Sequence, residues 1–209
     1  MKKVLYNLFD KTKIAALPIE KFSGRIITIV SKGETEKAVE YLLKQPILGF
    51  DTETKPAFKK GVSHKVALLQ VATYDTCFLF RLNHTGLTPA IKKLLEDKNV
   101  KKVALAWHDD ILSLHKRGDF NPGTFVELQQ LMPTIGIEDK SLQKLYANFF
   151  GKKISKRQQL SNWDADVLND KQKSYAATDA WACIKLYEEF KRLRDTNDYE
   201  LQEYIPEEG

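Results

Sequence analysis

Strands are predicted wherever apolar residues cluster in short runs, at residues 25–30, 47–51, 66–72, 77–80, 102–106 and 125–128. Helices are predicted where apolar residues recur at helical spacing, at residues 31–44, 89–96, 109–116, 141–150 and 170–194. The strands at 66–72 and 77–80 flank a short turn, so they form a hairpin and the sheet cannot be all parallel. The pattern predicts an α/β fold, in which helices flank a mixed β-sheet.

The chain has 209 residues, a length that suits one compact domain with short extensions. The predicted elements occupy residues 25–194, which we take as the domain. Residues 1–24 are then an N-terminal extension, and residues 195–209 are an acidic C-terminal tail. Apolar residues make up 43% of the chain, which is enough for a sizeable core.

The charge balance favours a polyanionic partner only weakly. The 33 Lys and Arg residues exceed the 28 Asp and Glu residues, which gives a formal net charge of +5. Because acids are concentrated in the tail, the body of the chain is more basic than this average. A basic surface suits nucleic acid, although many proteins with solvated lysines have a similar balance.

The sequence favours a cytoplasmic protein that does not enter the membrane. No apolar run approaches the ~18–20 residues that a membrane helix needs. The first apolar stretch, which ends at Asp10, is too short and too polar for a secretory signal. Cys77 and Cys183 lie in apolar contexts far apart in the sequence, so we expect two thiols in a reducing compartment.

Two acids close the apolar strand that begins at residue 47. Asp51 and Glu53 are two residues apart, so their side chains point to the same side of the strand. They would lie side by side at the edge of the sheet and repel each other, unless a positive charge lies between them. The alternative is that they are ordinary turn or capping acids at the end of a strand.

Further acids follow another strand and lie on the last helix. Asp109 and Asp110 come after the strand at 102–106; one of them could cap the next helix, which would leave the other free to point at a site. Tyr175 and Asp179 are four residues apart, on one face of a helix with small alanines between them. Those two side chains could instead make an ordinary buried hydrogen bond.

Taken together, the acids are typical of a metal site. Hard divalent ions such as Mg²⁺ and Mn²⁺ prefer oxygen ligands, and four carboxylates can hold two ions ~3.5–4 Å apart. Phosphodiester hydrolysis needs such an arrangement, since one ion activates water and the other stabilises the leaving 3′ oxygen. The four histidines and two cysteines lack zinc spacing, and no glycine-rich phosphate loop is present.

The order and spacing of these motifs resemble the DEDDy branch of the ribonuclease H-like 3′→5′ exonucleases, within the ribonuclease D and Werner-type group. The resemblance covers roughly residues 25–190. Its motifs are Gly49-Phe50-Asp51-Thr52-Glu53-Thr54, Lys102 to Asp110, and Tyr175-Ala176-Ala177-Thr178-Asp179-Ala180. A further block fits the same group, with Ser141-Leu142-Gln143-Lys144-Leu145 followed by Gln159-Leu160-Ser161-Asn162-Trp163.

The resemblance implies that four acids bind metal and that Tyr175 orients the attacking water. A tyrosine with an ordinary pKa of ~10 is a poor base at neutral pH, which favours a positioning role. The implied metal-binding acids are Asp51, Glu53, Asp110 and Asp179. The second motif departs from the family pattern, because Trp107-His108-Asp109 replaces small residues; we choose Asp110 and keep Asp109 as the alternative. A sister branch has a catalytic histidine where this chain has Ser174.

We expect substrate contacts from five residues near these motifs. The backbone of Thr52 should approach the terminal nucleotide, and Phe58 is a candidate for stacking on a base unless it tucks under its loop. Lys59, Lys156 and Arg157 are candidate phosphate contacts, although loop lysines are often only solvated. Lys60, Lys152 and Lys153 are further candidates, and Trp163 is expected in the core.

The implied function is hydrolysis of phosphodiester bonds at a single-stranded 3′ end, with two Mg²⁺ or Mn²⁺ ions and nucleoside 5′-monophosphates as products. The choice between DNA and RNA depends on contacts near the 2′ position, which the sequence does not place. Two alternatives remain: an inactive nucleic-acid-binding module with the same fold, and a nucleotidase that acts on free nucleotides.

Overall fold

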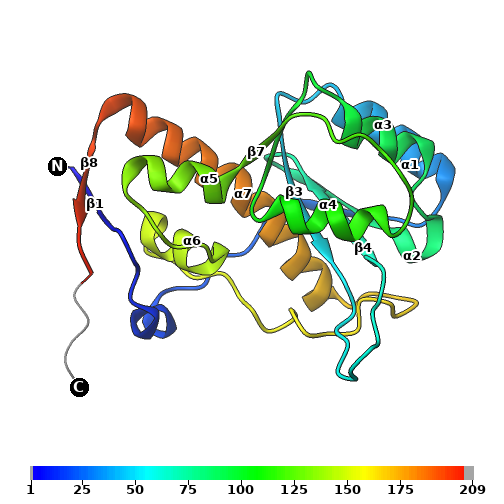
Figure 1. Cartoon of the computed structure of the whole chain (residues 1–209), viewed down its shortest axis with the longest axis horizontal. Coiled ribbons are helices and arrows are strands. Elements are labelled where there is room, and N and C mark those ends of the chain that lie inside the picture. Colours follow the sequence, from blue (N-terminus) through cyan, green and yellow to red (C-terminus); the bar gives the residue numbers. More distant parts are fainter. Residues whose placement is uncertain (1, 205–209) are drawn as a thin grey trace.

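The computed structural model describes residues 2–204, and a mixed six-stranded sheet lies at its centre (Figure 1). In spatial order the strands are β2 (Arg25–Ile29), β5 (Thr76–Arg81), β4 (Leu68–Ala72), β3 (Ile47–Glu53), β6 (Lys101–Ala104) and β7 (Phe125–Glu127). Strand β4 runs antiparallel to β3 and β5, and the other neighbours are parallel. The predicted mixed sheet and its β4–β5 hairpin are therefore confirmed.

Helices cover both faces of the sheet and form a separate apolar core with each face. Helix α7 (Asp170–Thr196) crosses one face, together with α5 (Leu128–Leu131) and α6 (Leu142–Phe150). The other face packs against α1 (Lys32–Leu42), α3 (Pro89–Glu96) and α4 (Trp107–His115). Strand residues alternate between the two cores, as Leu68 and Leu69 do, because successive side chains on a strand point to opposite faces. The short elements α2 (Leu82–Thr85) and η2 (Met132–Ile135) complete the body of the domain.

The start of α4 differs from the prediction that Asp109 or Asp110 caps the helix. Both acids lie inside its first turn, and the residue before the helix is Ala106, whose φ of 60° is left-handed. The carboxylate of Glu127, from β7, accepts hydrogen bonds from the backbone amides of Ala106 at 2.9 Å and Trp107 at 2.6 Å. A side chain from a neighbouring strand therefore satisfies the amides that a local cap would normally satisfy.

The segments on either side of residues 25–194 lie next to each other. Strand β1 (Lys3–Tyr6) pairs in parallel with β8 (Tyr199–Gln202), which follows the end of α7. Between β1 and β2, the chain forms η1 (Lys11–Ala16) and then an extended arm, residues 17–24, along the body. The sequence pattern did not predict β1, β8 or η1, and the last part of the acidic tail, 205–209, lies outside the described residues.

Among residues 2–204, no helix combines the length and the apolar character needed to span a bilayer. Cys77 and Cys183 are buried and unpaired thiols.

Candidate metal centre

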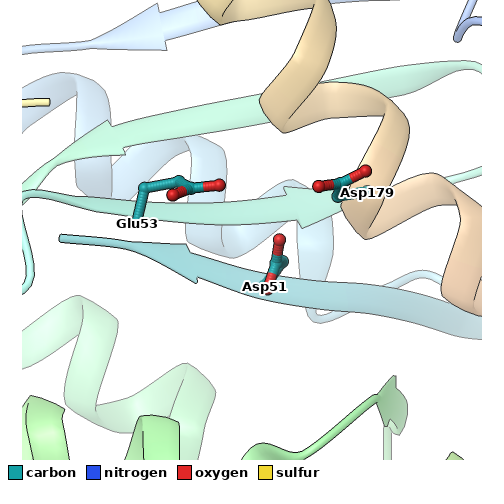
Figure 2. A group of neighbouring side chains, drawn as sticks. All are labelled: Asp51, Glu53 and Asp179. Atoms are coloured by element: carbon teal, nitrogen blue, oxygen red, sulfur yellow. The ribbon is translucent and has the colours of Figure 1, made fainter. Parts of the chain in front are cut away.

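The carboxyl end of β3 and the first half of α7 bring three acidic side chains together. Asp51 and Glu53 lie two residues apart on β3, an interior strand between β4 and β6. Helix α7 packs across the same face and carries Asp179. One carboxylate oxygen from each of the three acids lies within 4.8 Å of the others, and Figure 2 shows the groups converging between strand and helix.

Small residues allow the helix and the strand to come this close. A Cβ atom added to Gly49 of β3 would lie 2.0 Å from the carbonyl oxygen of Ala180 in α7, so a side chain there would collide with the helix backbone. Ala176 and Ala177, in the same part of α7, are also fully buried. The close approach to Gly49 is at Ala180, and the role of the alanines between Tyr175 and Asp179 stays a prediction.

Loss of hydration raises the pKa of all three carboxyl groups above its ordinary range. Glu53 is 8% exposed and Asp179 is 7% exposed. Loss of hydration, with repulsion from Asp51 and the other acids, raises the pKa of Glu53 to about 10. Burial raises the pKa of Asp179 to about 7, although Tyr175 and Lys156 favour its ionised form. Burial, followed by repulsion from Asp179, raises the pKa of Asp51 well above its ordinary range.

The chain itself offers little positive charge to offset this cluster. Within residues 2–204, none of the ion pairs joins Asp51, Glu53 or Asp179 to a lysine, arginine or histidine. Buried carboxylates without a partner are costly, and a divalent cation with oxygen ligands would remove that cost. The donor set, three oxygens converging in a buried position, therefore fits a hard divalent cation.

Asp110 lies beside the three acids and outside the group whose oxygens converge. It is in the first turn of α4, where its carboxylate accepts a hydrogen bond from the hydroxyl of Thr52, the residue between Asp51 and Glu53. Burial raises its pKa to about 7, while the Thr52 hydrogen bond favours the ionised form. Asp109 is exposed, so Asp110 is the acid of this pair that faces the cluster.

Tyr175 lies one helical turn before Asp179, and its hydroxyl interacts with that carboxylate. Burial and the surrounding acids raise the pKa of the phenol far above its ordinary value. In the metal-free protein the hydroxyl therefore stays protonated at neutral pH and can donate a hydrogen bond, and the positioning role of Tyr175 stays a prediction.

The acids open into a hollow of about 350 Å³, which we call the acid hollow. Its wall comes from β3, from the start of α6, from the loop at 154–159 and from α7. Of the predicted substrate contacts, Thr52 and Lys156 lie in this wall, and the ammonium of Lys156 is 3.4 Å from the Ser141 hydroxyl. The family block that starts at Ser141 contributes Leu142 and Gln143 to the same wall.

The other predicted contacts lie outside the acid hollow. Phe58 is 82% exposed, so it does not tuck under its loop, and neither Phe58 nor the exposed Lys59 lines the acid hollow. Arg157 lines a second hollow next to it. Lys152 pairs with Glu20 at 2.7 Å, and the Lys153 ammonium donates to the Ala15 carbonyl, so both are held by the chain itself.

Residue-by-residue reasoning missed two contacts that organise the centre. The hydroxyl of Thr52 links Asp110 to β3, whereas the sequence indicated only that the Thr52 backbone would approach substrate. Glu127 fixes the turn from which α4 begins. Both contacts join elements that are distant in the sequence, so no local pattern could have revealed them. Trp163, expected in the core, is fully buried.

Comparison with known proteins agrees with this geometry. Residues 26–194 match a family model described as a 3′–5′ exonuclease. The bifunctional 3′–5′ exonuclease and ATP-dependent helicase WRN of Mus musculus is 31% identical over 190 residues, which are 86% of this chain and 14% of that protein. A 3′–5′ exonuclease of Arabidopsis thaliana is 30% identical over 208 residues, which are 91% of this chain and 72% of that protein.

A solved structure shows the same architecture. The exonuclease domain of Aedes aegypti Nibbler superposes with a TM-score of 0.77 and 23% sequence identity, over 87% of this chain and 95% of that one. The mixed sheet flanked by helices is therefore a known arrangement.

Proposed function

Because this chain belongs to the 3′–5′ exonuclease family, we propose that it hydrolyses the phosphodiester bond at the 3′ end of a DNA or RNA strand with the help of two divalent cations, Mg²⁺ or Mn²⁺. The products would be nucleoside 5′-monophosphates. The family that the acidic motifs indicated is confirmed, and the chain is a nuclease. The nucleotide substrate, the number of ions and the products are the proposal.

The convergence of the half-buried Asp51 with the buried Glu53 and Asp179 carries the proposal. These acids would hold the ions, and Asp110 would join them from α4 through its contact with Thr52. Bound there, divalent cations would lower the pKa of the attacking water and neutralise charge on the phosphate and on the leaving oxygen.

The remaining residues of the acid hollow would position the strand. The protonated Tyr175 hydroxyl would donate a hydrogen bond that orients the attacking water beside Asp179. Lys156 lines the hollow and would contact a phosphate oxygen. Thr52 lines the same hollow, and its backbone would approach the terminal nucleotide while its hydroxyl donates to Asp110.

A cleavage assay on matched strands tests the proposal. We expect a 5′-labelled oligonucleotide to give a ladder of products shortened from the 3′ end in Mg²⁺ or Mn²⁺, and no products in EDTA. DNA and RNA strands of the same sequence identify the preferred sugar. Asp51→Asn keeps the size of the side chain and should abolish the ladder. An unaltered strand with the wild-type chain in both metals contradicts the proposal.

A second measurement reports ion binding without turnover. A ligand that binds only the folded state raises the unfolding temperature. We therefore expect Mn²⁺ to raise the melting temperature of the wild type and to have a much smaller effect on Asp51→Asn. Equal increases in melting temperature in the two proteins would indicate that Mn²⁺ binds at a site that does not include Asp51.

A further inference from the structure

A second hollow lies beside the acid hollow, and the proposed function does not use it. It encloses about 430 Å³, and the two hollows share Ser155 and Tyr175 in their walls. We call it the basic hollow. Three separate parts of the chain form it: the N-terminal arm at 19–21, the loop at 155–158 and the first turns of α7.

Each of these parts contributes one basic side chain to the wall: Lys21, Arg157 and Lys171. All three residues are exposed, and within residues 2–204 none of them takes part in an ion pair. The two acids in the wall already have partners. Glu20 binds Lys152 at 2.7 Å and accepts from the Tyr146 hydroxyl at 2.6 Å, while Asp170 pairs with Lys173 at 3.7 Å. The wall therefore has three basic side chains outside any ion pair, while each of its two acids has a lysine within 4.0 Å.

The arm that carries Lys21 is fixed to the body on both sides of this residue. The backbone amide of Glu20 donates to the Lys153 carbonyl at 2.8 Å, and the amide of Phe22 donates to the Thr178 hydroxyl at 3.0 Å. Phe22 is also buried in the core against α7. The backbone from which the Lys21 ammonium extends is thus held in place before any ligand binds, which reduces the entropy lost on binding.

The spacing along α7 relates the two hollows to a nucleic-acid backbone. Lys171, Tyr175 and Asp179 follow one another at four-residue intervals, so they lie on the same face of the helix. Lys171 is eight residues before Asp179, which corresponds to ~12 Å along the axis. An extended single strand that runs from the acid hollow along this face of α7 would therefore carry its backbone past the basic hollow.

We propose that Lys21, Arg157 and Lys171 form a phosphate subsite, which binds the backbone of the strand upstream of the bond that is cut. The ligand is a phosphodiester backbone, and its bases are not read there. This inference rests on the proposed function, because it places the scissile phosphate at the acid hollow. It also assigns a substrate contact to the N-terminal arm, outside the segment that matches the family model.

Two triple variants test the subsite. The first changes Lys21, Arg157 and Lys171 to Gln. The matched control changes Lys32, Lys93 and Lys191 to Gln; these exposed lysines line neither hollow, and the control removes the same three positive charges. The ratio of kcat/KM for a ten-nucleotide strand to kcat/KM for a dinucleotide is measured for each protein, because a dinucleotide is too short to reach the basic hollow.

We expect the ratio to fall about tenfold or more in the first variant and to stay at the wild-type value in the control, since three exposed charge contacts contribute ~0.5 kcal/mol or more each. Binding of a fluorescent ten-nucleotide strand in EDTA gives a readout without turnover. The slope of log affinity against log salt should be less steep by ~2 in the first variant, because each phosphate contact on a single strand contributes ~0.7.

An unchanged ratio and salt slope in the first variant would overturn the subsite, and so would an equal loss on both strand lengths. Failure of the proposed function gives a different result, because the wild type would then cut neither strand. The salt slope of strand binding in EDTA would still show whether the three basic residues bind the backbone. Melting temperatures of both variants show whether either change disturbs the fold.

Discussion

Replacing Glu53 by Gln should inactivate the enzyme and stabilise the metal-free protein. Without a cation, the Glu53 carboxyl group is buried among other acids, and its pKa rises from an ordinary value of 4.5 to about 10. Gln has nearly the same shape and carries no charge at any pH. The substitution therefore removes the electrostatic penalty and leaves the packing of β3 against α7 in place.

The expected gain follows from the two pKa values. Below pH 4.5 the Glu53 carboxyl group is protonated in both the folded and the unfolded chain, so its ionisation does not change the free energy of unfolding. Between pH 4.5 and about 10 the unfolded chain ionises while the folded chain stays protonated, so stability falls by ~1.4 kcal/mol per pH unit. At pH 7 the penalty is ~3 kcal/mol, and its removal should raise the melting temperature by roughly 6–12 °C.

Thermal unfolding in EDTA at pH 5, 6, 7 and 8 measures this gain. The difference between Glu53→Gln and the wild type should widen steadily as the pH rises. Glu40→Gln makes the same chemical change on the exposed surface of α1 and should shift the melting temperature little at any pH. A Glu53→Gln protein that is no more stable than the wild type, or a gain that does not depend on pH, would refute the electrostatic reasoning.

Three further substitutions test single contacts, two in the metal centre and one on the exposed loop after β3. Gly49→Ala forces α7 away from β3, since the new Cβ would meet the Ala180 carbonyl; we expect a loss of ~2 kcal/mol or more in urea unfolding and weaker Mn²⁺ binding by calorimetry. Glu127→Ala removes the acceptor for the amides at 106 and 107, which should cost ~1–2 kcal/mol and raise the Mg²⁺ concentration for half-maximal cleavage. Phe58→Ala should leave the melting temperature unchanged, because this side chain is 82% exposed, while base stacking predicts a KM about tenfold higher.

Local sequence patterns predicted the parts of this fold that depend on local physics. The start of α1 shows this, because Ser31 and Glu34 form a capping box within the first turn. Asp51 and Glu53 point to one face because strand side chains alternate, and Asp179 follows Tyr175 by one helical turn. Three of the four predicted metal-binding acids converge, and the metal-binding roles of all four remain predictions.

The remaining features depend on contacts between distant segments. Strands β1 and β8 have only four residues each, and each pairs with a segment almost 200 residues away, so the sequence around either strand does not indicate its partner. The turn before α4 has no local cap, since Glu127 comes from another strand. The place of Lys21 beside α7 depends on where the arm lies, which composition alone does not reveal.

The pairing of β1 with β8 brings the first and last strands of the described residues together. The arm between β1 and β2 is therefore tethered at both of its ends, once by the sheet and once by a strand that follows the last helix. Cleavage or deletion within residues 199–202 would leave β1 as an unpaired strand with open hydrogen-bonding groups. The segment before Lys21 would then lose one of its anchors, while the contacts of Glu20 and Phe22 with the body of the protein would still hold the backbone beside this lysine.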